Sequence, residues 1–535
     1  MAGEVVEIIS LGSSGEGIGV LASGKKIFVD SQVIPGEICR VEITQEKNKF
    51  ARGRCIELMT SSPERVLPFG TEIPGANLAH MSYKTQLKYK QDKVRDCLIR
   101  LGGVAPSAAD GVMNDIVPSD KDSNYRNHMQ YSVRDGRLCL KAHGTGKDVQ
   151  VDRSVLEYEM FGKVREAIEA AFAGYPTRLF GGAVIRGSER TGEILIELVS
   201  FSDAPSEVLI RDASEYISAS GLAGRLSQLN LAGITFRISN TATEKRTRGG
   251  KRVVLYGNDY YTEILCGREF KVKSGAFFQV NVPQAEVLYG LARPDRYTGS
   301  LWDLYCGTGT VGLSLVKEGH KVMGVDISPE AIASARDNAS RFGIDAEFIC
   351  RPASKITTLL TRITHDDAVV VDPPRAGLDF SLVRSLIEQK PACISYISCD
   401  PSTLARDLKM LSDGGYVIES VTPVDMFPQT SHVEAVVLLS KLSSAPKLEV
   451  KINMSDLDLT EAEAKATYDE IQEYVKEQTG LHVTHLNIAQ IKRKHGIIER
   501  ANYNLPKSEK SRQPNCPPEK EKAIVAALKH FKMID

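Results

Sequence analysis

The first 62 residues alternate apolar and polar side chains in short runs separated by glycine-containing turns. The runs are VVEIISLG, GIGVLA, KKIFVDS, EICRVEITQ and RGRCIELM, with turns at Gly12 to Gly17, Ser23-Gly24 and Pro35-Gly36. An alternation with a period of two predicts β-strands that bury one face. Short strands separated by such turns predict either a small closed barrel of the oligonucleotide-binding kind or, equally, another small β-module.

Residues 63–265 have a mixed pattern that predicts an α+β domain. Residues 81–101 carry apolar side chains at helical spacing and end at Gly102-Gly103, which predicts a helix that packs on the following domain. Further along, HMQYSVRD, ILIELVS and KRVVLYG predict strands between helix candidates. Segment 243–252, TEKRTRGGKR, is basic, and for it a solvated surface loop is favoured over an RNA contact.

From about residue 266 to residue 442 the pattern changes to regular β-α alternation. Apolar strands such as LWDLYC, KVMGVDI, AVVVD and SYISC alternate with helices, one of them opening at Ser328-Pro329 and ending at Gly343. This pattern predicts an α/β domain with a doubly wound, Rossmann-like parallel sheet, whose ligands bind beyond the carboxyl ends of the strands. Residues 443–535 predict a separate helical extension of unknown role.

Composition adds limits on the class of protein. The chain has 535 residues, 42% of them hydrophobic and 25% charged, and this is typical of a soluble protein. No apolar run is long enough to span a membrane, and no signal peptide is expected. The 10 cysteines form no CxxC pair, which favours free thiols in a reducing cytoplasm. The net charge of −1 does not by itself indicate a nucleic-acid-binding protein, although the first 60 residues are rich in Lys and Arg. We expect a cytoplasmic monomer.

The segment DLYCGTGTVG follows a predicted strand and opens a predicted helix. Its glycines, Gly307 among them, let the backbone approach a ligand closely. Asp326 ends the next strand, where a carboxylate can accept hydrogen bonds from both ribose hydroxyls of an adenosine. The loop also satisfies the dinucleotide fingerprint. Taken alone, it therefore fits a methyltransferase and a dehydrogenase equally well.

Three clusters downstream of this loop decide between the two. VVVDPPRAGLD places Asp372 and Arg375 at a strand end, and arginine suits carbonyl oxygens or phosphate. YISCDPS places Cys399 at the next strand end, before a helix whose dipole favours a thiolate. Glu434 begins the last apolar strand, a setting that raises a carboxyl pKa and suits proton transfer. His432 is a second candidate base, although a lone histidine is more often structural.

This set fits methylation of carbon-5 of uracil. That carbon is too weak a nucleophile to attack a methyl sulfonium directly, and a thiolate that adds at carbon-6 activates it. A base must then remove the carbon-5 proton so that the thiol can leave. One cysteine, one carboxylate and one S-adenosylmethionine loop are the minimum, and a hydride-transfer enzyme has no use for the Cys399–Glu434 pairing.

The chain resembles the RumA/TrmA-type RNA (uracil-5-)-methyltransferases over residues 1–442. The resemblance is carried by DPPRAG, ISCD, DMFPQTSHVE and GAFFQVN, and in the N-terminal segment by GEGIGV and KFARGRCIEL, which resemble a TRAM domain. It implies Cys399 as the nucleophile and Glu434 as the base. It also implies an S-adenosylmethionine site lined by Gln279, Tyr305, Asp326 and Asp372, with Thr310 at a loop position that touches it. To these the residues themselves add Gly307, from the glycine loop, and Arg375, as a donor toward the substrate.

The resemblance has one informative departure. Many TRAM-bearing relatives hold an iron–sulfur cluster on four cysteines, but here the ligand positions hold Leu67, Ile73, Ala76 and Ser154. We therefore predict no cluster and a packed apolar substitute. The TRAM-like domain favours a uridine of 23S ribosomal RNA as the target. A tRNA target and a catalytically inactive RNA-binding relative are the alternatives.

Overall fold

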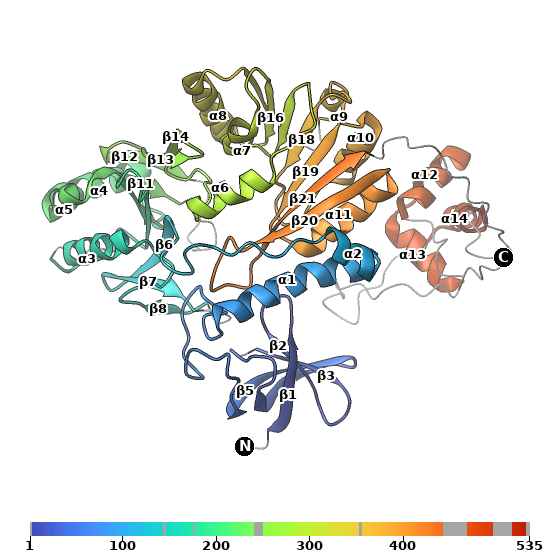
Figure 1. Cartoon of the computed structure of the whole chain (residues 1–535), viewed down its shortest axis with the longest axis horizontal. Coiled ribbons are helices and arrows are strands. Elements are labelled where there is room, and N and C mark those ends of the chain that lie inside the picture. Colours follow the sequence, from blue (N-terminus) through green and yellow to red (C-terminus); the bar gives the residue numbers. More distant parts are fainter. Residues whose placement is uncertain are drawn as a thin grey trace. The chain divides into compact units, whose positions relative to one another are not determined.

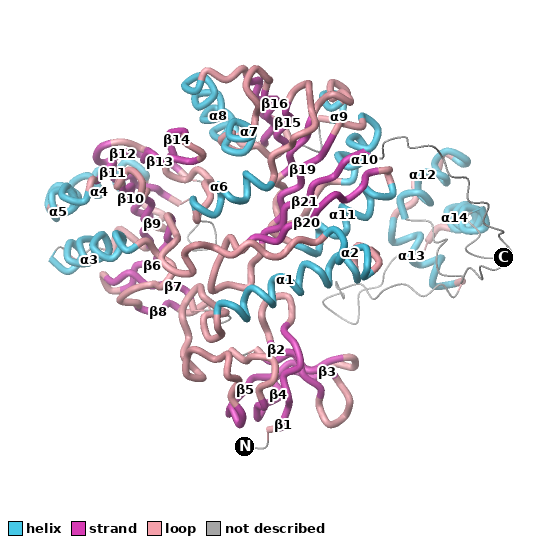
Figure 2. Tube along the Cα trace, viewed as in Figure 1, coloured by secondary structure: helices cyan, strands magenta, loops and turns pink. Residues whose placement is uncertain are grey.

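The computed structural model describes residues 3–30, 32–142, 146–174, 176, 178–239, 250–352, 356–441, 468–495 and 516–530. The chain divides into two compact units, residues 1–445 and residues 446–535, and each is described by itself. Figure 1 labels the helices and strands, and Figure 2 distinguishes them by colour. Among the residues described, no helix has both the length and the apolar composition needed to cross a membrane.

The N-terminal segment is a closed barrel, which is one of the two architectures that its alternating pattern left open. Its strands run in the spatial order β1-β2-β3-β5-β4. They are β1 (Glu4–Leu11), β2 (Gly17–Val20), β3 (Lys26–Val29), β4 (Ile38–Glu46) and β5 (Phe50–Thr60). Val6 and Ile8 of β1 point into the barrel core, while Glu7 between them is exposed. A Cβ on Gly19 of β2 would lie 2.2 Å from the Val6 side chain, so the tight approach of these strands requires glycine.

Two helices follow the barrel. They are α1 (Tyr83–Arg100) and α2 (Pro106–Val112). The hydroxyl of Ser82 caps α1 by accepting a hydrogen bond from the backbone N–H of Thr85. Val94 and Leu98 of α1 belong to a core cluster with the helix that follows Cys399. Helix α1 therefore packs against the α/β domain.

The positions where relatives hold cluster-ligating cysteines are packed in this protein. Leu67, Ile73 and Ala76 lie in one apolar cluster with Tyr125 and Leu156. The fourth position, Ser154, is buried, and its hydroxyl accepts a hydrogen bond from the backbone N–H of Leu156 at 3.2 Å. Apolar packing thus occupies the region in which the resemblance places the cluster.

The domain between the barrel and the α/β domain in sequence contains a mixed sheet, in the order β12-β11-β10-β9-β6-β7-β8. Its strands are β6 (His128–Arg134), β7 (Arg137–Lys141), β8 (Asp148–Gln150), β9 (Gly182–Gly187), β10 (Ile194–Ser200), β11 (Leu231–Ile238) and β12 (Lys251–Gly257). Helices α3 (Glu159–Gly174), α4 (Ser206–Ser220) and α5 (Leu222–Leu226), and the 3-10 turn η1 (Ser227–Leu229), accompany it. Residues 243–249 of the predicted basic segment 243–252 lie outside the described residues.

The α/β domain begins with the hairpin β13 (Tyr260–Leu265) and β14 (Arg268–Lys273). Its sheet has the order β17-β16-β15-β18-β19-β21-β20. The strands are β15 (Leu301–Leu304), β16 (Val322–Asp326), β17 (Ala346–Cys350), β18 (Ala368–Val371), β19 (Cys393–Ser398), β20 (Tyr416–Val424) and β21 (Glu434–Lys441). The helices are α6 (Val282–Leu291), α7 (Thr310–Leu315), α8 (Pro329–Phe342), α9 (Thr357–Leu360), α10 (Phe380–Gln389) and α11 (Pro401–Asp413).

This sheet is covered on both faces, as predicted for a doubly wound fold. In β18, Ala368 and Val370 join the cluster that contains residues of α6, α7 and α8, while Val369 and Val371 join the cluster with α1, α10 and α11. The sheet departs from all-parallel order at one edge, because β21 runs antiparallel to both β19 and β20. The connection from β20 to β21 spans only residues 425–433, too short for a parallel crossover.

The C-terminal unit consists of α12 (Tyr468–Thr479), α13 (His485–Lys494) and α14 (Pro518–His530) in its described part. Ile471, Val475, Ile488, Ile524 and Leu528 pack together in one apolar core. The unit is thus helical, while residues 442–467 and 496–515 lie outside the described residues.

Candidate active site

Four predicted site residues lie at the carboxyl ends of neighbouring parallel strands. Leu304 of β15 is paired with Val325 of β16 and with Val371 of β18, so Tyr305, Asp326 and Asp372 stand at one level of the sheet. Cys399 comes directly after β19, which pairs with β18 in parallel. The structure therefore brings the predicted cofactor residues and the predicted nucleophile to the carboxyl edge of one sheet, where ligands of such sheets bind.

The loop from Tyr305 to Gly309 turns sharply before α7. Tyr305, Gly307 and Gly309 have φ values of 75°, 53° and 81°. A left-handed conformation is strained for tyrosine, which marks a locally constrained backbone. Asp303 links β15 to the start of α7, because its Oδ2 accepts a hydrogen bond from Gly312 N at 2.7 Å.

Asp303 is a site residue that the sequence analysis did not single out. It is fully buried, and burial raises its pKa to about 7. Within the described part of the chain, its Oδ1 has no hydrogen-bond partner. A buried acceptor without a donor is unusual. The sequence does carry a signal that could have identified Asp303: it is an acidic residue in the segment DLYC, at the end of a strand and before a glycine loop.

Asp326 has the geometry needed to hold an adenosine ribose. Its Oδ2 accepts from Gly307 N at 3.0 Å and its Oδ1 accepts from Ser328 N at 2.8 Å. Each oxygen keeps a further lone pair for a ribose hydroxyl. Thr310 begins α7, with its hydroxyl 3.4 Å from that of Tyr289. The residues of this loop fit S-adenosylmethionine.

Gln279 lies before α6 rather than on the sheet. Its backbone carbonyl accepts a hydrogen bond from the Asn127 side chain at 2.9 Å, and its side chain is half-buried. Asn281, two residues on, caps α6. The GAFFQVN segment is therefore fixed to both the central domain and the α/β domain.

Cys399 and Glu434 face each other across β19 and β21. Ser398 is paired with Ala435 in the antiparallel register, so the residue after Ser398 and the residue before Ala435 lie opposite one another. Glu434 is 6% exposed. Burial and the nearby Asp372 raise the pKa of Glu434 to about 8, against the lowering effect of Arg375. The raised pKa of Glu434 agrees with the prediction made from its position at the start of an apolar strand.

The expectation of a stabilised thiolate at Cys399 is wrong. Burial, Glu434 and Asp372 together raise the pKa of the thiol to about 11, although Arg375 lowers it. The carboxylate of Asp400 caps α11 by accepting from Ser402 N at 2.8 Å and from Thr403 N at 3.4 Å. The N-terminus of the helix is thus already satisfied by a negative group, and burial outweighs its dipole.

Arg375 and His432 lie beside this pair. The Arg375 Nη2 atom is 3.4 Å from His432 Nδ1, and the Arg375 backbone carbonyl accepts from the Thr403 hydroxyl at 3.2 Å. Burial and neighbouring cations, Arg375 first among them, lower the pKa of His432 to about 4. His432 is therefore neutral at pH 7, and the charge of Arg375 lowers the pKa of both Cys399 and Glu434. Asp372 completes the group, and burial raises its pKa to about 7.

Comparison with known proteins identifies two matching family models. Residues 237–442 match the tRNA (uracil-5-)-methyltransferase model, and residues 3–56 match the TRAM domain model. The chain is 32% identical over 461 residues to an uncharacterised RNA methyltransferase of Halalkalibacterium halodurans, covering 82% of this chain and 97% of the relative. It is 32% identical over 460 residues to one from Clostridium acetobutylicum, covering 82% and 96%.

A solved structure is similar over most of the chain. It is the Pyrococcus abyssi tRNA (uracil-54, C5)-methyltransferase in complex with S-adenosyl-L-homocysteine, with a TM-score of 0.62 and 27% sequence identity. The match covers 81% of this chain and 99% of that chain.

Proposed function

Because the chain belongs to the tRNA (uracil-5-)-methyltransferase family, we propose that it methylates carbon-5 of a uridine in 23S ribosomal RNA through a covalent bond to Cys399. It is an enzyme that methylates RNA with S-adenosylmethionine. The observation that carries the proposed mechanism is the register that sets Cys399 opposite Glu434, at the same sheet edge as the cofactor loop.

Each step of the reaction has a residue of this chain. The Cys399 thiol first gives its proton to solvent; its thiolate sulfur then forms a bond to carbon-6 of uracil, and the electron pair of the 5,6 double bond makes carbon-5 nucleophilic. S-adenosylmethionine supplies the methyl group that carbon-5 takes. The Glu434 carboxylate then accepts the carbon-5 proton. The carbon–hydrogen electron pair restores the 5,6 double bond as the carbon–sulfur bond breaks and Cys399 leaves as a thiolate.

The other site residues bind and orient. Asp326 would hold the ribose hydroxyls, and Gln279, Tyr305, Gly307, Thr310 and Asp372 would line the rest of the cofactor site. Arg375 would donate to a uracil carbonyl oxygen or to a phosphate, both of which accept from a guanidinium. The target base must leave its stack, because carbon-6 is attacked from the face of the ring.

Ribosomal RNA is favoured over tRNA because the chain carries a TRAM domain ahead of the catalytic region. A tRNA substrate is the second candidate, since the similar Pyrococcus abyssi enzyme acts on uridine 54 of tRNA. Deletion of the gene, followed by mass spectrometry of separated 23S ribosomal RNA and tRNA, distinguishes the two. We expect 5-methyluridine to disappear from one position of 23S ribosomal RNA and to return with the wild-type gene but not with a Cys399→Ala gene. Loss from tRNA alone selects the second candidate, and loss from neither contradicts both.

A further inference from the structure

The loop that leads to Glu434 is held by parts of the chain outside its own sheet. This loop, residues 425–433, joins β20 to β21. Asn281 donates to the carbonyl of Met426, Tyr125 to that of Pro428 and Lys93 to that of Ser431. The conformation of the loop is therefore set by its surroundings rather than by hydrogen bonds between strands.

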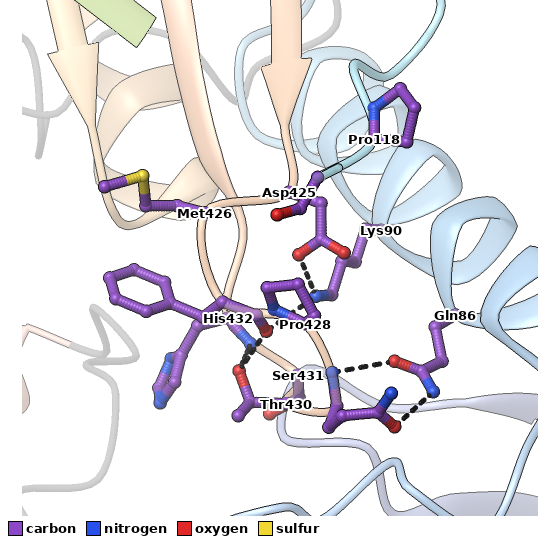
Figure 3. Close-up of polar contacts among 12 residues, drawn as sticks. Gln86, Lys90, Pro118, Asp425, Met426, Pro428, Thr430, Ser431 and His432 are labelled. Atoms are coloured by element: carbon purple, nitrogen blue, oxygen red, sulfur yellow. Dashed lines mark hydrogen bonds and ion pairs between the residues drawn. The ribbon is translucent and has the colours of Figure 1, made fainter. Parts of the chain in front are cut away.

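The most deeply buried of these contacts is an ion pair between Lys90 of α1 and Asp425. The Lys90 Nζ atom is 2.5 Å from Asp425 Oδ1, and both side chains are 0% exposed. The same ammonium donates to the backbone carbonyl of Phe427 at 3.0 Å. Figure 3 shows the Lys90 side chain reaching from the helix to the start of the loop. A charge this deeply buried is strongly destabilising when its partner is removed.

A second contact from α1 fixes the middle of the loop. The Gln86 side chain donates to Gln429 Oε1 at 2.9 Å and accepts from Gln429 N at 2.9 Å. Gln429 has a φ of 67°, a left-handed conformation that a non-glycine residue keeps only when its surroundings hold it. Gln86 and Lys90 are four residues apart, so both project from one face of α1.

We propose that Lys90 is a positioning residue, which through Asp425 and the Phe427 carbonyl holds the 425–433 loop so that Glu434 reaches the carbon-5 proton. This inference rests on the proposed function. Cys399 and the cofactor loop are on other segments, following β19 and β15. Loss of Lys90 should therefore leave addition of the thiol and methyl transfer in place, and should slow proton removal and release of the RNA.

A Lys90→Met variant of the full chain tests this inference. The readouts are turnover of a uridine-containing RNA, the KM for S-adenosylmethionine, and the fraction of enzyme that stays bound to methylated RNA on a denaturing gel. We expect kcat to fall at least tenfold, the KM to stay within about twofold, and the covalent adduct to accumulate, as we also expect for Glu434→Gln. Lys88→Met is the matched control, since Lys88 lies on the same helix with its side chain 76% exposed. It should behave as wild type.

A second variant distinguishes a misfolded protein from a folded protein in which Glu434 is mispositioned. Lys90→Met with Asp425→Leu removes both buried charges, and such replacements are often tolerated. We expect it to fold and still to accumulate adduct, because the Phe427 carbonyl has lost its donor from α1 and keeps only the hydrogen bonds from Thr430 within the loop itself. Wild-type turnover without trapped adduct in a folded variant overturns the role of Lys90. If Glu434→Gln also turns over normally without adduct, the proposed base is wrong as well, so the two failures are distinguishable.

Discussion

Replacing Glu434 by glutamine should stabilise the protein, and the gain should depend on pH. The wild-type carboxyl is buried in an apolar strand opposite Cys399 and near Asp372. Its pKa is raised from 4.5 to about 8 in the folded protein. Folding therefore favours the protonated form. The amide of glutamine has nearly the same shape and does not ionise in this range.

The size of the effect follows from the two pKa values. Below pH 4.5 the carboxyl is protonated in both the folded and the unfolded chain, so its full contribution to stability is present. Above that pH the unfolded chain loses the proton first, and stability falls by about 1.36 kcal/mol per pH unit until the folded group titrates near pH 8. The whole window amounts to at most about 5 kcal/mol, which is large against a typical domain stability of about 5–15 kcal/mol.

Urea unfolding followed by tryptophan fluorescence measures this difference. The chain has one tryptophan, Trp302, which is 2% exposed in β15 of the same sheet, so its signal reports the domain that contains Glu434. The Glu434→Gln variant should gain over wild type steadily from pH 5 to pH 8. Glu388→Gln, at an exposed position of α10, is the control and should show no such trend. A difference that stays flat across this range would falsify the assignment of Glu434 as a group that burial keeps protonated.

Three further predictions test the rest of the site. Cys399→Ala should abolish methylation and the covalent RNA adduct while binding S-adenosylmethionine within about twofold of wild type, as measured by calorimetry; methylation by this variant contradicts the covalent mechanism. Asp326→Ala should weaken S-adenosylmethionine binding by about 10- to 100-fold, because it would remove the two charge-assisted hydrogen bonds that we propose it makes to the ribose; unchanged affinity refutes that contact. Protein purified without oxygen should contain no iron and show no visible absorbance, and Ala76→Asp, which places a charge in the apolar cluster, should lower the unfolding free energy by about 3 kcal/mol or more. Bound iron, or an Ala76→Asp variant as stable as wild type, counts against the apolar substitute.

The barrel, the doubly wound sheet and the strand-end positions of Cys399 and Asp372 were predictable from the sequence. Each rests on a local pattern: alternation with glycine turns, or an apolar strand followed by a polar residue and a helix cap. The antiparallel β21 was not predicted, because strand direction depends on how the connection before it packs. The raised pKa of Cys399 was not predicted either. The sequence indicates the helix that follows the cysteine, but it does not indicate how deeply the thiol is buried.

Lys90 shows most clearly why local patterns were insufficient. Residues 83–100 contain several lysines, and lysine is almost always exposed in folded proteins, so the sequence gives no reason to treat one of them as buried. Its partner, Asp425, is 335 residues away along the chain. Only the packing of α1 against the sheet brings the two together.

The electrostatics of the site imply an order for its two proton losses. The ionised forms of Cys399 and Glu434 disfavour one another, and Asp372 disfavours both. The charge of Arg375 lowers the pKa of both Cys399 and Glu434, so one cation acts on both groups. In the proposed reaction, both groups must nevertheless lose a proton within one turnover. Formation of the carbon–sulfur bond consumes the thiolate and removes its charge from the side chain. Glu434 can then ionise without facing a second anion on the sulfur, so addition of Cys399 prepares the base that later releases it.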